Sequence, residues 1–227
     1  MVVALVVLTF VAFILWDHYY RRSAVHAASE ERVVGSDPNM PFGVSDVHVP
    51  DGVFLGRGHI WARLEQNGDI SLGVDDFTAK LVAGVKKIET LAKNVRLCRG
   101  KPIFSLHVGE SKKLDFFAPF EGHVLEVNHK VLRNPSLIAL DTYRSGWLMR
   151  IRAVRLASTL KVLRLAEDAK EWMREEIIRL RDFLSRQMNG TSAAPALTDG
   201  GLILPEAFLQ MGAEGWEAFQ KEFLEDY

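Results

Sequence analysis

The sequence predicts a mainly β domain, either a small sandwich or a small barrel, preceded by an apolar N-terminal helix and followed by a helical extension. Three observations lead to this fold class. Short runs of β-forming residues, separated by turn residues, occupy residues 53–152. Residues 2–16 form an apolar run that contains no charged residue. Apolar residues recur with helical spacing over residues 167–187.

The N-terminal run is shorter than the roughly 20 residues that span a bilayer, although the range begins near 17. Arg21 and Arg22 follow the apolar run, whereas a signal peptide carries its basic residues before it. We therefore predict an uncleaved transmembrane anchor over residues 1–22, rather than a signal peptide or a buried helix. The positive-inside rule then places the globular part in the cytoplasm of a single-pass membrane protein.

The β domain begins with a hairpin cue, since Asn67-Gly68 separates two runs of β-forming residues. Helical spacing follows over residues 75–82, with an aspartate near the start. A second hairpin is predicted from Lys101-Pro-Ile-Phe-Ser-Leu-His-Val108, the polar stretch Gly109-Glu-Ser-Lys-Lys113 and the residues after it. Pro119 and Gly122 then interrupt the strand pattern, so the chain turns before the next strand.

The rest of the chain is predicted to be irregular over residues 128–141, to form a last strand over residues 146–152, and then to become helical. We expect the helical extension and the C-terminal tail to pack on the β domain, although either could instead bind a partner. The predicted division of the chain is a transmembrane anchor at 1–22, a linker at 23–50, a β domain at 51–152, a helical extension at 153–188, a second linker at 189–204 and a helical tail at 205–227.

Composition excludes several classes of function. Lysine and arginine total 28 against 29 acidic residues, so no excess of positive charge favours nucleic acid. Cys98 is the single cysteine, which excludes an intrachain disulfide and a cysteine metal cluster. The seven histidines have no ligand spacing, so we expect no metal. Because no catalytic arrangement such as Ser/His/Asp or paired carboxylates emerges, we also expect no enzymatic activity.

Six motifs follow one another within residues 53–152. They are His59-Ile-Trp61, Gly73-Val-Asp-Asp-Phe77, Arg99-Gly-Lys-Pro102, the stretch from Asp115 through Pro119 and Gly122 to Asn128, Asn134-Pro135, and Asp141-Thr-Tyr143-Arg-Ser-Gly146-Trp147. In these motifs and their order the segment resembles the H-protein of the glycine cleavage system, a shuttle protein that carries a lipoyl group. The resemblance implies a barrel-sandwich hybrid fold of the lipoyl and biotinyl type.

The resemblance also implies a lipoyl lysine on the second hairpin, and here the sequence departs from the family. Counting forward from Gly100 reaches Glu110, and counting back from Pro119 reaches Ser111. Matching the local string Glu110-Ser-Lys-Lys113 instead gives Lys113, or Lys112, as the attachment site. That alignment shifts the first arm by an odd number of residues and requires a bulge.

Two functions therefore stay open. The first is a non-catalytic interaction or scaffold module at the membrane, without a lipoyl group, that binds protein partners through the hairpin tip and the C-terminal helices. The alternative is a lipoyl shuttle that uses Lys113 or Lys112 to carry an aminomethyl group or electrons in a glycine cleavage-type system. A membrane-fusion-type adaptor is disfavoured, because those proteins usually insert a long helical hairpin where this chain has a few residues.

Overall fold

The computed structural model describes residues 40–82, 84–188 and 201–225. The anchor predicted for residues 1–22 lies outside the described residues. Within them, no helix combines the length and the apolar character needed to cross a membrane. The predicted fold class is corrected accordingly: a mainly β fold with a C-terminal helical extension remains, and the transmembrane helix and the membrane localisation are not retained.

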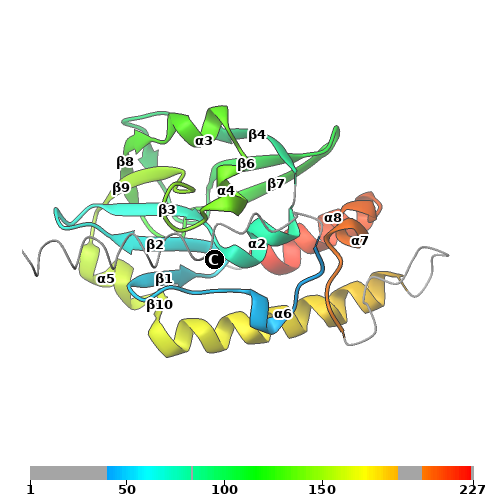
Figure 1. Cartoon of the computed structure of the whole chain (residues 1–227). Coiled ribbons are helices and arrows are strands. Elements are labelled where there is room, and N and C mark those ends of the chain that lie inside the picture. The colour runs from blue at the N-terminus through cyan, green and yellow to red at the C-terminus, as the bar shows by residue number, and fades with distance from the viewer. Residues whose placement is uncertain (1–39, 83, 189–200, 226–227) are drawn as a thin grey trace, which may run out of the picture. The chain divides into compact units, whose positions relative to one another are not determined.

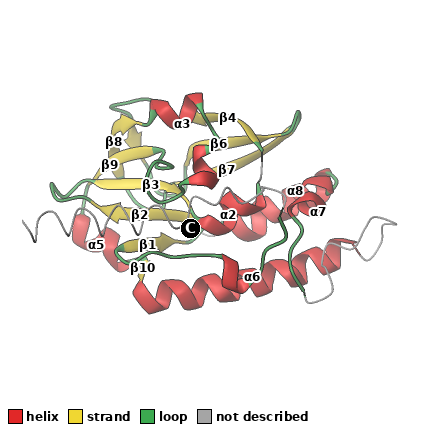
Figure 2. Cartoon of the chain, viewed as in Figure 1, coloured by secondary structure: helices red, strands yellow, loops and turns green. Residues whose placement is uncertain are grey.

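The strands form two antiparallel sheets (Figure 1, Figure 2). One sheet has seven strands in the order β10-β1-β2-β3-β9-β8-β5, and the other has three in the order β4-β6-β7. The strands are β1 (Val53–Gly56), β2 (Ile60–Leu64), β3 (Ile70–Val74), β4 (Val85–Thr90), β5 (Arg96–Leu97), β6 (Pro102–Val108), β7 (Lys112–Phe117), β8 (Gly122–Val127), β9 (Met149–Ala153) and β10 (Arg164–Leu165).

Local sequence explains the first hairpin and the helix after it, and both predictions are confirmed. Gly68 adopts a φ of 84°, and its N–H donates to the carbonyl of Glu65 at 3.0 Å, which closes the turn between β2 and β3. Asp75 then caps α2 (Asp76–Leu81), because its carboxylate accepts a hydrogen bond from the N–H of Thr78 at 2.9 Å.

The helical elements differ from the prediction in two places. Residues 128–141, expected to be irregular, form two short helices, the first of which is capped by the Asn128 side chain. The helical extension predicted at 153–188 is interrupted: its first helix ends at Lys161, and residues 164–165 pair with β1 instead. The remaining helices are η1 (Val44–Asp46), α3 (His129–Arg133), α4 (Leu137–Leu140), α5 (Leu156–Lys161), α6 (Ala166–Met188), α7 (Pro205–Gln210), α8 (Ala213–Phe219) and η2 (Gln220–Leu224).

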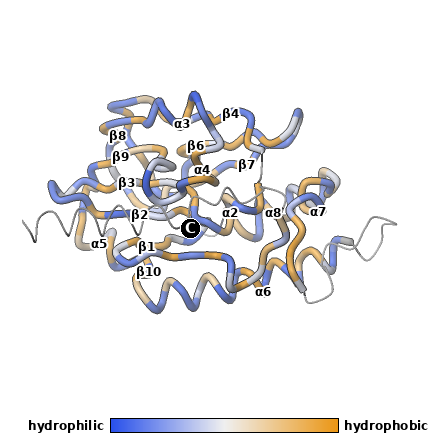
Figure 3. Tube along the Cα trace, in the orientation of Figure 1, coloured by the Kyte–Doolittle hydropathy of each residue, from blue (hydrophilic) through white to orange (hydrophobic). Residues whose placement is uncertain are grey.

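The C-terminal helices share one hydrophobic core with the β sheets. Polar and apolar residues alternate along α6 (Figure 3), and its apolar side chains Ile177, Leu180 and Phe183 are buried. Phe219 and Phe223 of the tail are buried in the same cluster as Trp61 and Phe116 of the sheets. The predictions that the helical stripe packs on the β domain and that the tail docks on the core are therefore confirmed.

Candidate functional site

The hairpin of β6 and β7 is the place where the sequence predicts a site. Val108 pairs with Lys112, so the connecting turn consists of Gly109, Glu110 and Ser111, all of which are exposed. Gly109 has a φ of 64°, which favours glycine at this position. The turn contains no lysine, because Lys112 and Lys113 are already the first residues of strand β7.

Lys113 lies on the outer face of the hairpin, opposite His107. Its Nζ lies 2.8 Å from Oδ1 of Asp115, and 45% of its side chain is exposed. The hydrogen bond to the Asp115 carboxylate raises the pKa of Lys113. Lys113 is thus an exposed ammonium held in an ion pair on the surface.

Lys112 points to the opposite side of the strand and contacts the C-terminal tail. Its Nζ donates hydrogen bonds to the carbonyls of Leu209 and Met211, the second at 3.0 Å. The same Nζ lies 4.9 Å from the ring centroid of Trp216. Partial burial lowers the pKa of Lys112. The two adjacent lysines are therefore in different surroundings, one exposed and one covered.

The tail also covers the free edge of the three-stranded sheet, of which β7 is the last strand. The side-chain amide of Gln220 accepts from the N–H of Asp115 at 2.9 Å and donates to its carbonyl at 2.8 Å. The indole Nε1 of Trp216 donates to the carbonyl of Lys113 at 3.0 Å. Side chains of the tail thus take the place of a neighbouring strand at an edge that would otherwise be open.

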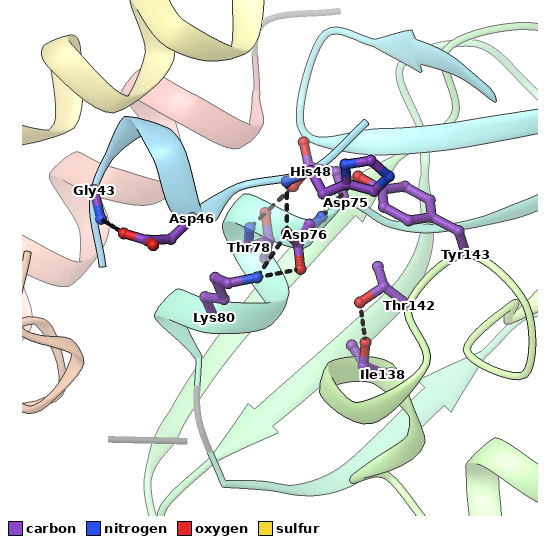
Figure 4. Close-up of polar contacts among 10 residues, drawn as sticks. All are labelled: Gly43, Asp46, His48, Asp75, Asp76, Thr78, Lys80, Ile138, Thr142 and Tyr143. Atoms are coloured by element: carbon purple, nitrogen blue, oxygen red, sulfur yellow. Dashed lines mark hydrogen bonds and ion pairs between the residues drawn. The ribbon is translucent and has the colours of Figure 1, made fainter. Parts of the chain in front are cut away.

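A cluster of polar groups surrounds the start of α2 (Figure 4), but it has a structural explanation. The carboxylate of Asp76 accepts from the N–H of His48 at 2.8 Å and from Nζ of Lys80 at 2.6 Å. The hydroxyl of Tyr143 lies 3.2 Å from the N–H of Asp76, and burial raises the pKa of Tyr143. Each carboxylate here serves the helix or the preceding segment, so the cluster resembles an anchor for α2 more than an acid–base pair.

A buried histidine joins the β domain to α6. Nδ1 of His59 lies 2.8 Å from Oδ2 of Asp75, and its Nε2 lies 3.4 Å from Oε2 of Glu176, an ion-pair contact without hydrogen-bond geometry. The imidazole stacks on Phe77 at a centroid distance of 4.2 Å. Burial alone lowers the pKa of His59, but the two carboxylates outweigh it and raise the pKa to about 9. His59 is therefore an imidazolium that holds α6 against the β sheet.

Comparison with known proteins identifies the family of this chain. A sequence model described as glycine cleavage H-protein matches residues 55–176, more than half of the 227-residue chain. The chain belongs to the glycine cleavage H-protein family. The family match runs from β1 into α6, so the tail that covers the hairpin lies outside the matched residues.

Two curated relatives and one solved structure illustrate the similarity. The glycine cleavage system H protein of Carboxydothermus hydrogenoformans is 32% identical over 130 residues, covering 56% of this chain and 96% of that protein. The one from Alkalilimnicola ehrlichii is 32% identical over 114 residues, covering 46% and 79%. A crystal structure of a glycine cleavage system H protein from Mycobacterium marinum has a TM-score of 0.49 and 18% identity, covering 55% of this chain and 98% of its own.

The family membership confirms the resemblance drawn from the six motifs, and with it a lipoyl-type H-protein domain. It gives no support to the prediction that a cofactor is absent, because H-proteins carry a lipoyl group. Lys112 and Lys113 stay the candidates for attachment. Sequence reasoning missed Gln220, Trp216 and Glu176, since no local pattern connects the last third of the chain with the hairpin or with His59.

Proposed function

We propose that this H-protein-family chain is a non-catalytic interaction module whose hairpin binds a protein partner without carrying a lipoyl group. The observation that supports it is the turn itself, which consists of Gly109, Glu110 and Ser111. A swinging arm requires an ε-amine at an exposed turn, where an attached dithiolane can reach separate active sites. Neither the carboxylate of Glu110 nor the hydroxyl of Ser111 can form that amide.

The surroundings of Lys112 also favour this proposal. Its ammonium donates to two backbone carbonyls of the tail and lies over the Trp216 ring. Acylation would remove the positive charge and require these carbonyls to find other donors, and a buried carbonyl left without a partner costs about 1–3 kcal/mol. A lipoyl ligase would also have to reach an amine that the tail covers.

The exposure of Lys113 favours a second candidate, a lipoyl shuttle in a glycine cleavage-type system. Its amine stands just beyond the turn, with 45% of the side chain exposed. Acylation would break its ion pair with Asp115, but a surface ion pair contributes only about 0–1 kcal/mol, so this loss would not prevent modification. In this case the chain would carry an aminomethyl group or electrons between partner enzymes.

Intact-mass spectrometry distinguishes the two candidates. The full chain is produced in a host that lipoylates its own H-protein, alongside Lys112→Arg and Lys113→Arg, which keep the positive charge but cannot be lipoylated. The interaction module predicts the unmodified mass for all three proteins. A mass increase of one lipoyl group that disappears only in Lys113→Arg would replace this proposal with the carrier.

A further inference from the structure

A groove with a volume of about 920 Å³ lies between residues 43–51 and helix α6. Figure 1 shows this N-terminal segment, in blue, beside α6. Apolar side chains from both sides line it, among them Val47, Met173 and Leu202. Small-molecule sites in proteins have volumes of about 300–1,000 Å³ and are lined mostly by apolar groups with a few polar ones. The groove therefore has the size of a small-molecule site, and its lining combines apolar side chains with a large share of polar and charged ones.

The charged side chains of the groove are mainly positive. Lys170, Arg174 and Arg181 line it from α6, and Asp51 is the acidic residue among its lining. At about 100° per residue, the three cations lie within about 40° of one another around the helix axis. The chain as a whole has a net charge of −1, so this stripe is a local concentration of positive charge.

The three cations differ in whether an acidic side chain already neutralises them. Nζ of Lys170 lies 3.6 Å from Oε2 of Glu167, and Nη1 of Arg174 lies 2.8 Å from Oε2 of Glu171. Within residues 40–82, 84–188 and 201–225, the guanidinium of Arg181 forms no ion pair. Arg181 is nevertheless partly buried. A charge that is partly removed from water, with no counter-charge among the described residues, is suited to an anionic ligand.

The absence of a side chain at Gly201 leaves room for the guanidinium of Arg181 in the groove. A Cβ atom at this position would collide with the guanidinium nitrogens of Arg181. Gly201 also has a φ of 75°, a conformation that residues with a Cβ rarely adopt. Arg181 therefore lies against the backbone at Gly201, where a side chain would displace its guanidinium from this position in the groove.

We propose that this groove is a binding site for a small molecule that combines an apolar body with an oxyanion, either a carboxylate, a sulfonate or a phosphate. Arg181 binds the oxyanion, because its guanidinium presents two parallel donors that match such a group. The apolar body lies against Met173 and Leu202. A second anionic group about 10 Å from the first would reach Arg174, which lies two helical turns away on the same face.

The test uses 8-anilinonaphthalene-1-sulfonate, an aromatic body with one sulfonate, titrated against the full chain and followed by its fluorescence. We expect saturable binding that Arg181→Ala and Arg181→Gln each weaken by about tenfold or more, because a hydrogen bond to a charged group is lost. Arg186→Ala is the matched control, since it removes the same charge from another face of α6; it should change the affinity less than about twofold. Circular dichroism reports whether each variant is folded.

The affinities of the wild type and the variants decide whether the proposed site exists. Selective loss of affinity in either folded Arg181 variant supports the site. Absence of saturable binding to the wild type, or equal losses in the Arg181 and Arg186 variants, would overturn it. The groove shares no residue with the hairpin, so this result is independent of whether any lysine carries a lipoyl group.

Discussion

Two of the polar attachments between the C-terminal extension and the β domain use different chemistry. At α6, the imidazolium of His59 lies between the carboxylates of Asp75 and Glu176, and all three side chains are almost fully buried. At the edge of β7, the tail uses the amide of Gln220 and the indole of Trp216, both neutral, to bond the backbone of the strand.

The difference between the two attachments predicts how each responds to change. A buried charge network depends on every member, because loss of one leaves another charge without compensation. The neutral hydrogen bonds of Gln220 and Trp216 make separate, smaller contributions and contain no titrating group. The charged member of the β7 attachment, Lys112, donates to uncharged carbonyls, so this attachment contains no buried pair of opposite charges. The α6 attachment should therefore be more sensitive than the β7 attachment to pH and to single substitutions.

The largest effect is expected for Glu176→Ala. The substitution removes a carboxylate that contacts His59 and lies 3.0 Å from Nη1 of Arg179. Breaking a buried ion pair by removing one partner costs about 3–5 kcal/mol. Urea unfolding measures the loss. The neighbouring Glu175 is exposed on the same helix, so Glu175→Ala is the control and should change the unfolding free energy by less than about 0.5 kcal/mol. Equal effects of the two substitutions would refute the buried network.

The second-largest effect is expected when the pH changes, because the free energy of unfolding depends on the protonation of His59. The pKa of His59 is about 9 in the folded protein and 6.5 in the unfolded chain. Because the folded protein holds the proton more tightly, the stabilisation is fully present below about pH 6.5 and is lost as the pH rises through about 9. The loss amounts to about 3 kcal/mol. Urea unfolding across this range should show the decline in the wild type, and His59→Gln should show a flatter profile.

The two attachments also mark the limit of what the sequence predicts. The turn at Asn67-Gly68 and the cap at Asp75 depend on neighbouring residues, so local patterns suffice to predict them. The contact between Gln220 and Asp115 joins residues that are 105 positions apart. No periodicity contains such information, because the pairing arises only when the tail packs on the folded sheet.

In the candidate site, too, local sequence predicts some features, and contacts with the distant tail determine others. The motifs around the hairpin predict the two strands and the family, and the absence of lysine at the counted positions agrees with a turn of Gly109, Glu110 and Ser111. From the sequence alone, Lys112 and Lys113 cannot be told apart as attachment sites. Adjacent residues of a strand point to opposite faces, and the sequence does not show what covers each face. Their difference depends on the tail, which covers one face of the strand and leaves the other exposed.

A smaller effect is expected at the β7 edge. Gln220→Ala removes two hydrogen bonds, each worth about 0.5–1.5 kcal/mol, so the unfolding free energy should fall by about 1–2 kcal/mol at any pH between about 6 and 9. Hydrogen exchange at the Asp115 amide should become faster, since Gln220 is its acceptor. Gln210→Ala changes the same residue type at an exposed position of α7 and should affect neither measurement. Unchanged exchange in Gln220→Ala would argue against the edge contact.

The smallest effect is expected for Lys113→Ala. The ion pair with Asp115 is partly exposed, and such pairs contribute about 0–1 kcal/mol. The substitution should therefore shift the urea midpoint only slightly, and less in high salt than in low salt. A loss as large as that of Gln220→Ala would show that Lys113 has a further contact in the folded protein.

The central claim is that the hairpin lacks a lysine where a lipoyl arm must stand, and a substitution at the turn tests it most directly. Ser111→Lys introduces an amine at the exposed tip without altering Lys112 or Lys113. Wild type and variant are produced together in a lipoylating host, and the intact masses are compared. The account predicts an unmodified wild type and one added lipoyl group on Ser111→Lys. A lipoyl group on the wild-type protein, at Lys112 or Lys113, would contradict it.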